Sequence, residues 1–299
     1  MISVKTGIRP EEVRMQGQHV LFVEGKDKDA VDPKVLDKLF GDIIKIEPMG
    51  PSSSIRSVAE SLFSYHPTYY FLIDRDHHDN DFVNKCWDNF PDQATHNLLV
   101  WRRREIENYF LDSTYLIHSK YCQVSQAELE KVVLKFANER VFLDAANYVV
   151  TSIREELKKN WIQIFSSPTD FSSKEAALHT LKSANEFGQH RTSVDQKVSP
   201  EEVECRFHDF LSRMTGGLDQ LTMGTGEWVT MVQGKKVFNQ VVNSSCFRVK
   251  TTDDKLLQGR EKFNEVVKDL LQKDASVQPT DFMVLKKLID TRINGIRRM

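Results

Sequence analysis

The sequence predicts an α/β fold in which helices cover both faces of a parallel sheet and a helical insert interrupts the domain. Three observations support this. Apolar runs of strand length recur through the first 110 residues, separated by stretches with helical spacing. The strand-like runs are apolar throughout instead of alternating, which is typical of a sheet buried on both faces. From about residue 125, amphipathic helical periodicity replaces the strand pattern.

The elements of the α/β part alternate in a regular order. Strands are expected at residues 19–24, 42–49, 68–74 and 96–101. Helices are expected at residues 32–41, 52–65 and 80–90. The first of these helices has Pro33 near its start and Gly41 after its end, and the second has Ser57 and Glu60 spaced like a capping box. In such a sheet the functional groups gather at the carboxyl ends of the strands.

The rest of the chain reads mainly as helix. Periodicity predicts helices within 125–161, 172–187 and 201–214, and two more near 255–273 and 280–294. The polar stretch 188–200 is interpreted as a loop, and 216–242 has mixed character. We therefore expect three parts: an α/β core at 1–124, a helical insert at 125–218, and C-terminal elements at 219–299 that complete the core and add helices.

Composition excludes several classes of protein. Hydrophobic residues make up 40% and charged residues 28%, as in ordinary globular proteins. The sequence has no apolar run of membrane-spanning length and no apolar region near its start, so we expect a cytoplasmic protein that neither spans a membrane nor is secreted. The cysteines form no C-x-x-C pair, so any metal must have oxygen ligands. With a net charge of -2, only local basic clusters favour a nucleic-acid partner.

Acidic residues follow two of the expected strands. Glu24 and Gly25 end the first, and Asp74 and Asp76 end the third. In an extended backbone, residues two apart point to the same side, so both aspartates are expected to converge. Neighbouring carboxylates repel one another unless a cation lies between them. Oxygen ligands of this kind suit Mg²⁺ or Mn²⁺, which predicts phosphoryl chemistry at this edge.

Three motifs, "VEGKDKD", "LIDRD" and "RRREIENYFLD", carry a family resemblance. They resemble the toprim domain of topoisomerases, primases and OLD-type nucleases, in the DUF4435 branch that includes the toprim effector of the PARIS anti-phage system. The resemblance covers most of residues 18–112 and extends to "VQGKKVF". It implies a toprim-type parallel sheet sandwiched by helices. The family's metal ligands and its catalytic glutamate and lysine match the following residues: Glu24, Asp74, Asp76, Glu105, Glu107 and Lys235.

Within this match, Glu24 is expected to bind metal or to act as acid or base, and Lys235 to face the scissile phosphate. Glu105 and Glu107 match acids near the metal site, where the resemblance implies that they could serve a second ion. Many OLD-type sequences have an aspartate four residues after the glutamate, where this chain has Lys28. Asp27 or Asp29 could substitute for that aspartate.

The family resemblance also implies an activity and partners. It points to a Mg²⁺-dependent (or Mn²⁺-dependent) endonuclease that is the toxic effector of an anti-phage system. Such an effector is released from an ABC-type ATPase partner, forms a homodimer and cleaves host tRNA. The chain has no P-loop motif, so ATP hydrolysis would belong to the partner. An OLD-like DNA nuclease and an inactive toprim regulatory subunit remain the alternatives.

Basic residues supply the candidate nucleic-acid contacts: Lys26, Arg102, Arg103 and Lys236. The arginines could hold a nucleic-acid backbone or could cover the sheet edge. The role of Arg75, between the two aspartates, is likewise open: it could brace the strand end or hold Glu105 or Glu107.

Overall fold

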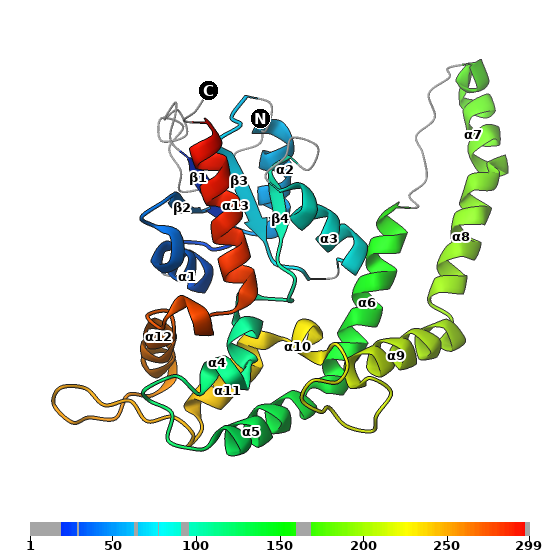
Figure 1. Cartoon of the computed structure of the whole chain (residues 1–299). Coiled ribbons are helices and arrows are strands. Elements are labelled where there is room, and N and C mark those ends of the chain that lie inside the picture. Colours follow the sequence, from blue (N-terminus) through cyan, green and yellow to red (C-terminus); the bar gives the residue numbers. More distant parts are fainter. Residues whose placement is uncertain are drawn as a thin grey trace. The chain divides into compact units, whose positions relative to one another are not determined.

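The fold is described from a computed structural model, which covers residues 19–28, 30–62, 65–76, 78–90, 96–159 and 169–296 (Figure 1). The chain divides into two compact units. The first unit comprises Met1–Glu139 and Trp228–Met299, and the second comprises Arg140–Glu227. The second unit therefore begins and ends later than the expected insert at 125–218. The difference arises because helix α5 (Gln126–Asn138) packs against helices of the first unit.

A parallel sheet of four strands forms the centre of the first unit. Its strands are β1 (Val20–Val23), β2 (Lys45–Pro48), β3 (Tyr69–Ile73) and β4 (Leu98–Val100), in the order β2-β1-β3-β4. All residues of β1, β3 and β4 are buried. Both faces are covered, which explains why these strands are apolar without alternation. The α/β class and the parallel sheet predicted from the sequence are confirmed.

The strand order creates a switch point between β1 and β3. The chain enters the sheet at β1, crosses to β2 at one edge, and then returns to β3 on the other side of β1. The connections from β1 and from β3 therefore leave the sheet in opposite directions, and sheets of this kind bind ligands at the carboxyl ends of the strands on either side of the switch point. Glu24 follows β1 and Asp74 follows β3, so both lie at this switch point.

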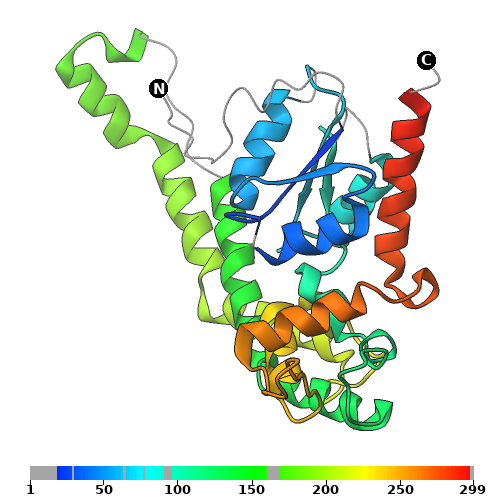
Figure 2. The ribbon, with the colours of Figure 1, turned by 90° about the vertical axis from the view of Figure 1, so that its left-hand side faces the viewer.

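Helices flank the sheet as the sequence predicts. They are α1 (Val31–Phe40), α2 (Ser52–Leu62), α3 (Asn80–Asn89) and α13 (Thr280–Ile296). In the two views, α2 and α13 lie on opposite faces of the sheet (Figure 2). The predicted capping box is wrong, because α2 begins at Ser52, directly after Pro51, and Ser57 lies inside it. The Ser57 hydroxyl instead donates to the Ser53 carbonyl one turn earlier, at 3.2 Å.

The remaining elements of the first unit surround a cluster of aromatic rings. They are η3 (Ile106–Leu111), α4 (Ser113–Leu116), α5, α10 (Trp228–Met231), α11 (Gly234–Asn243), α12 (Gly259–Leu270) and η5 (Ala275–Val277). Phe110 of η3 stacks on Phe238 of α11 with ring centroids 5.1 Å apart. Helix α11, which follows the second unit in the sequence, thus packs into the core of the first unit. Over the described residues, no helix is both long and apolar enough to cross a membrane.

The second unit consists of α6 (Val141–Lys159), η4 (Thr169–Phe171), α7 (Lys174–Ser183), α8 (Asn185–Lys197) and α9 (Pro200–Thr215). The loop expected at 188–200 is wrong, because most of it belongs to α8. No residue of α8 is buried, so this helix has no apolar face. The polar composition of the stretch therefore reflects its exposure to solvent and does not indicate a loop. The single helix expected at 172–187 is interrupted at Ala184, which has an extended backbone.

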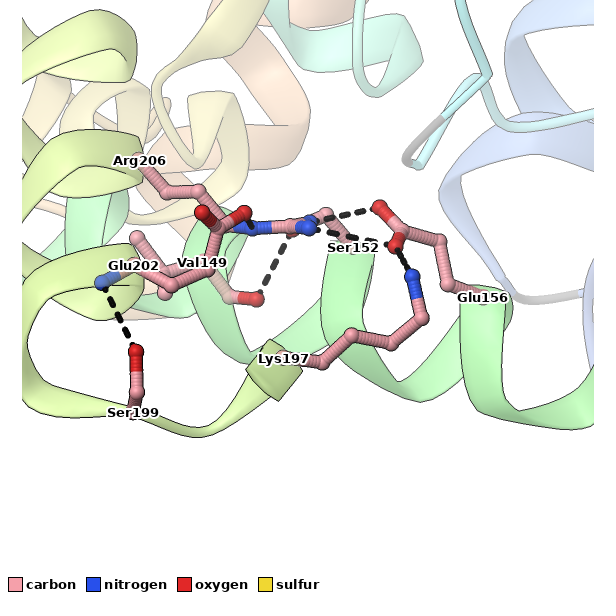
Figure 3. Close-up of polar contacts among 7 residues, drawn as sticks. All are labelled: Val149, Ser152, Glu156, Lys197, Ser199, Glu202 and Arg206. Atoms are coloured by element: carbon pink, nitrogen blue, oxygen red, sulfur yellow. Dashed lines mark hydrogen bonds and ion pairs between the residues drawn. The ribbon is translucent and has the colours of Figure 1, made fainter. Parts of the chain in front are cut away.

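An ion-pair network joins three helices of the second unit (Figure 3). Arg206 of α9 donates to Glu156 of α6 at 2.6 Å and to Glu202, one turn earlier on α9, at 2.6 Å. Lys197, at the end of α8, also pairs with Glu156. Hydrogen bonds from Arg206 and Lys197 lower the pKa of Glu156 to about 2. The network therefore ties α6, α8 and α9 together while Glu156 is ionised.

Replacing Arg206 by methionine is expected to lower the free energy of unfolding by about 1 kcal/mol at pH 7, since the paired groups are partly exposed and screened. Because pairing depresses the pKa of Glu156, its stabilisation is present above the unfolded pKa and is lost as the pH falls toward 2. The difference in free energy of unfolding between wild type and Arg206→Met, measured by urea unfolding, should therefore be smaller at pH 3 than at pH 7. Arg213→Met is the control, because it removes the Arg213–Glu227 ion pair, which is more exposed to solvent.

Candidate metal-binding carboxylate site

Glu24 is anchored by backbone amides at the carboxyl ends of β1 and β3. Its Oε1 accepts a hydrogen bond from the Asp74 amide at 2.9 Å, and the Ser52 amide at the start of α2 also binds it. Gly25 follows with a φ of 146°, a conformation that side chains disfavour, and its amide bonds to the Gly50 carbonyl. The sharp turn after β1 thus leaves the Glu24 carboxylate beside the end of β3.

Asp74 is the only described carboxylate with a buried and unpartnered oxygen. Its Oδ1 has no hydrogen-bond partner. Burial raises the pKa of Asp74 well above the usual range, and so do the charges of Asp32, Glu24, Glu107 and Glu105. A buried acceptor without a donor is costly unless something outside the chain satisfies it.

The extended backbone expected through Asp74 and Asp76 is wrong. β3 ends at Ile73, and Asp76 has a φ of 47°, in the left-handed region. The chain therefore turns before Asp76, which is exposed. The charge of Asp76 still raises the pKa of both Glu24 and Glu105, so it lies within electrostatic reach of the site.

Arg75 braces the loop after β3. It is buried, and its guanidinium donates to the carbonyls of His78 and Arg102 and to the Asn80 side chain, at 3.0, 2.8 and 2.6 Å. These bonds hold the loop against the end of β4. Of the two roles left open by the sequence, the contacts support the bracing of the strand end.

Glu105 and Glu107 join the site from the segment between β4 and η3. Glu105 Oε2 accepts a hydrogen bond from the Lys235 amide at 2.8 Å. Glu107 is buried, and burial together with the charge of Glu105 raises its pKa to about 7. The Lys235 charge lowers the pKa of both glutamates, so the lysine lies on the same side as the acids. The structure thus brings together residues that are 130 positions apart.

Asp32 completes the group and was not among the residues predicted from the sequence. It lies in the first turn of α1, and burial followed by the charges of Glu107 and Glu24 raises its pKa well above the usual range. Of the substitutes considered for the aspartate missing at Lys28, Asp27 is exposed and Asp29 lies outside the described residues. An acid directly before Pro33, at the start of the helix that follows β1, was the available sequence signal.

We call these five residues the carboxylate cluster: Glu24, Asp32, Asp74, Glu105 and Glu107. Each has a raised pKa, with burial as the largest cause. For each of them, the charge of another acidic side chain is a further cause of the shift. Without a counter-ion the cluster therefore opposes its own ionisation.

The candidate nucleic-acid contacts fall into two groups. Arg102 pairs with Asp281 at 2.8 Å and lies over the Trp87 ring, and Arg103 donates to the Asn108 carbonyl and lies over the Tyr109 ring. These arginines hold the first unit together, and each remains only partly exposed. By contrast, the lysines near the cluster are exposed: Lys26, Lys235 and Lys236.

Rising pH is expected to destabilise the metal-free protein through this cluster. A carboxyl group with a raised folded-state pKa contributes stability below its unfolded pKa and loses it as the pH rises through the folded value, which is about 7 for Glu107. Glu107→Gln should therefore gain on the order of 2 kcal/mol relative to wild type between pH 5 and pH 8. Urea unfolding in EDTA measures the free energy of unfolding of both proteins at each pH. A difference in stability between wild type and Glu107→Gln that stays constant from pH 5 to pH 8 would contradict the prediction.

Comparisons with protein-family models and with curated proteins gave no match to this chain. As their side chains stand, the described His, Cys, Asp and Glu residues include no group of three or more that could hold a metal ion. The geometry of the cluster and its chemistry therefore carry the functional argument.

Proposed function

We propose that the carboxylate cluster is the active site of a Mg²⁺- or Mn²⁺-dependent endonuclease of the toprim type. The buried and unpartnered Oδ1 atom of Asp74, at the switch point of a parallel sheet, is the observation that carries the proposal. A hard cation would satisfy this oxygen and relieve the repulsion that raises the pKa of every member of the cluster.

The donor set fits such a cation, since the cluster offers only carboxylate oxygens. Asp74, Asp32 and Glu107 are the residues that would hold it. Glu24 and Glu105 each accept a hydrogen bond from a backbone amide, and the charges of both raise the pKa of Asp74. When bound, the metal would activate water and stabilise charge on the phosphodiester. Lys235 adds an exposed ammonium group that can neutralise a phosphate next to these acids.

Substrate and partners are taken from the family resemblance. It favours RNA, and tRNA in particular, over DNA, and it implies a toxic role in anti-phage defence. It also implies an ABC-type ATPase that restrains the chain and a homodimer that forms on release. The exposed lysines Lys26, Lys235 and Lys236 supply positive charge for a nucleic-acid backbone near the acids.

Metal removal tests the proposal directly. The full chain, freed from any ATPase partner, is incubated with end-labelled tRNA, single-stranded RNA and duplex DNA in EDTA, Mg²⁺ or Mn²⁺. We expect RNA to be cleaved only with a divalent cation, by at least about 10³-fold over EDTA. Cleavage of DNA alone would support an OLD-like nuclease. Equal cleavage in EDTA and in metal would contradict the assignment.

The second candidate function is a regulatory toprim subunit that binds nucleic acid or a partner without turnover. It is favoured by the lack of a metal-holding group among the described side chains as they stand. The same assay separates the two functions, because a regulatory subunit would cleave none of the three substrates in any metal.

A further inference from the structure

The chain re-enters the first unit at α10, which has only the four residues Trp228–Met231. A helix of one turn leaves its last carbonyls without partners inside the helix. Here, the four consecutive carbonyls of residues 229–232 accept hydrogen bonds from Arg104, which precedes η3, and from Asn108, which lies within it. Asn108 Nδ2 donates to the carbonyls of Val229 and Val232, at 2.8 and 2.9 Å. The Arg104 amide donates to Thr230 at 3.0 Å, and its Nη1 donates to Met231 at 2.9 Å.

Asn108 also connects this turn to the carboxylate cluster. Its side chain is fully buried, and its Oδ1 accepts the Glu105 amide at 3.0 Å. The start of α11 approaches so closely that a Cβ on Gly234 would lie 2.2 Å from Asn108 Oδ1. The next residue, Lys235, donates its amide to Glu105 at 2.8 Å. One amide side chain therefore fixes both the backbone of Glu105 and the element that carries Lys235.

We propose that Asn108 is a positioning residue of the carboxylate cluster, and that Arg104 assists it; what the positioned groups do rests on the metal-dependent function proposed above. The two side chains hold the carbonyls of 229–232, which sets the start of α11 and directs Lys235 toward Glu105 and Glu107. Neither residue needs to contact metal or substrate. Their contribution is to join two segments that are separated in sequence by the whole second unit.

The substitution Asn108→Asp isolates this role. Aspartate has the same size and keeps an acceptor for the Glu105 amide, but an ionised carboxylate donates to neither carbonyl and a protonated one can donate to only one of the two. The chain offers a matched control in Asn97, which is 1% exposed and donates through Nδ2 to the carbonyls of Pro67 and Tyr69. Asn97 precedes β4, at the amino edge of the same sheet, away from the cluster. Asn97→Asp should loosen the fold in a similar way without disturbing the cluster.

Three measurements on the full chain separate positioning from general loosening. In Asn108→Asp, the Lys235 amide should lose at least about tenfold of its protection from hydrogen exchange, because its acceptor is no longer held in place. Mn²⁺ affinity, measured by calorimetry, should fall by about 10- to 100-fold, as for the loss of groups that orient metal ligands. The turnover number should fall while KM for RNA stays near wild type. Asn97→Asp should leave all three within about twofold of wild type.

A milder variant guards against misfolding. Arg104→Lys keeps the charge and the backbone amide but loses the Nη1 bond to Met231, and it should give intermediate losses in all three measurements. The proposal is overturned if Asn108→Asp keeps Lys235 protected and Mn²⁺ bound as in wild type, or if Asn97→Asp loses both equally. If the wild-type chain neither binds Mn²⁺ nor cleaves RNA, the proposed function fails, and the Lys235 exchange rate alone decides the positioning.

Discussion

Asp74→Asn is expected to abolish metal-dependent cleavage and, at the same time, to stabilise the metal-free protein. Asparagine keeps the size of the side chain but removes the charge that a cation would need. Cleavage in Mg²⁺ should fall on the order of 10³-fold or more. Because burial and four neighbouring acids raise the pKa of Asp74, the neutral side chain should raise the free energy of unfolding at pH 8 by about 1–2 kcal/mol.

The opposite signs of these two effects make the test specific. Cleavage of labelled RNA measures the loss of activity, and urea unfolding in EDTA measures the gain in stability. Asp79→Asn is the control, since Asp79 is exposed in the same loop and caps α3 by accepting the Phe82 amide at 2.7 Å. Asparagine caps a helix equally well, so this variant should behave as wild type. Loss of cleavage together with lower stability in Asp74→Asn would instead indicate a structural role.

Gly234→Ala is expected to destabilise the first unit by about 2–3 kcal/mol. The added methyl group would lie 2.2 Å from Oδ1 of the Asn108 side chain and 2.7 Å from the backbone nitrogen of Asn108. Asn108 cannot move aside without breaking buried hydrogen bonds to Val229, Val232 and Glu105. The start of α11 must therefore shift, which also moves Lys235 away from the cluster.

A second glycine provides the matched control for this substitution. Gly188 lies inside α8, and a Cβ there would meet nothing within 4 Å. Gly188→Ala should stabilise the helix by about 0.5–1 kcal/mol, because alanine has the higher helix propensity. Urea unfolding followed by circular dichroism compares the two variants. Equal stabilities of Gly234→Ala and wild type would mean that Asn108 can adapt, and would weaken its role as a positioning residue.

Local patterns in the sequence predicted most of the fold. Apolar runs identified the four strands, and helical spacing identified α1, α2 and α3, because each pattern depends on residues close in the chain. Two local predictions failed for a common reason. The pair Ser57 and Glu60 and the polar stretch 188–200 both have the composition of helix boundaries or loops, yet both lie largely in helices. Local composition indicates which residues are exposed and which could cap a helix, but it does not determine where a helix begins.

By itself, the sequence determined that acids would stand at the carboxyl edge of a parallel sheet, because Glu24 and Asp74 directly follow apolar strands. The family motifs added Glu105 and Glu107, but only the tertiary structure added Asp32 and showed which segments meet. The charges of Glu107 and Glu24 raise the pKa of Asp32, and the Lys235 amide, which follows the second unit in the sequence, donates to Glu105. Asn108 supports the contact between Lys235 and Glu105 by donating hydrogen bonds to the carbonyls of Val229 and Val232, more than 120 positions away. Such pairings depend on chain topology and buried hydrogen bonds, which no local periodicity encodes.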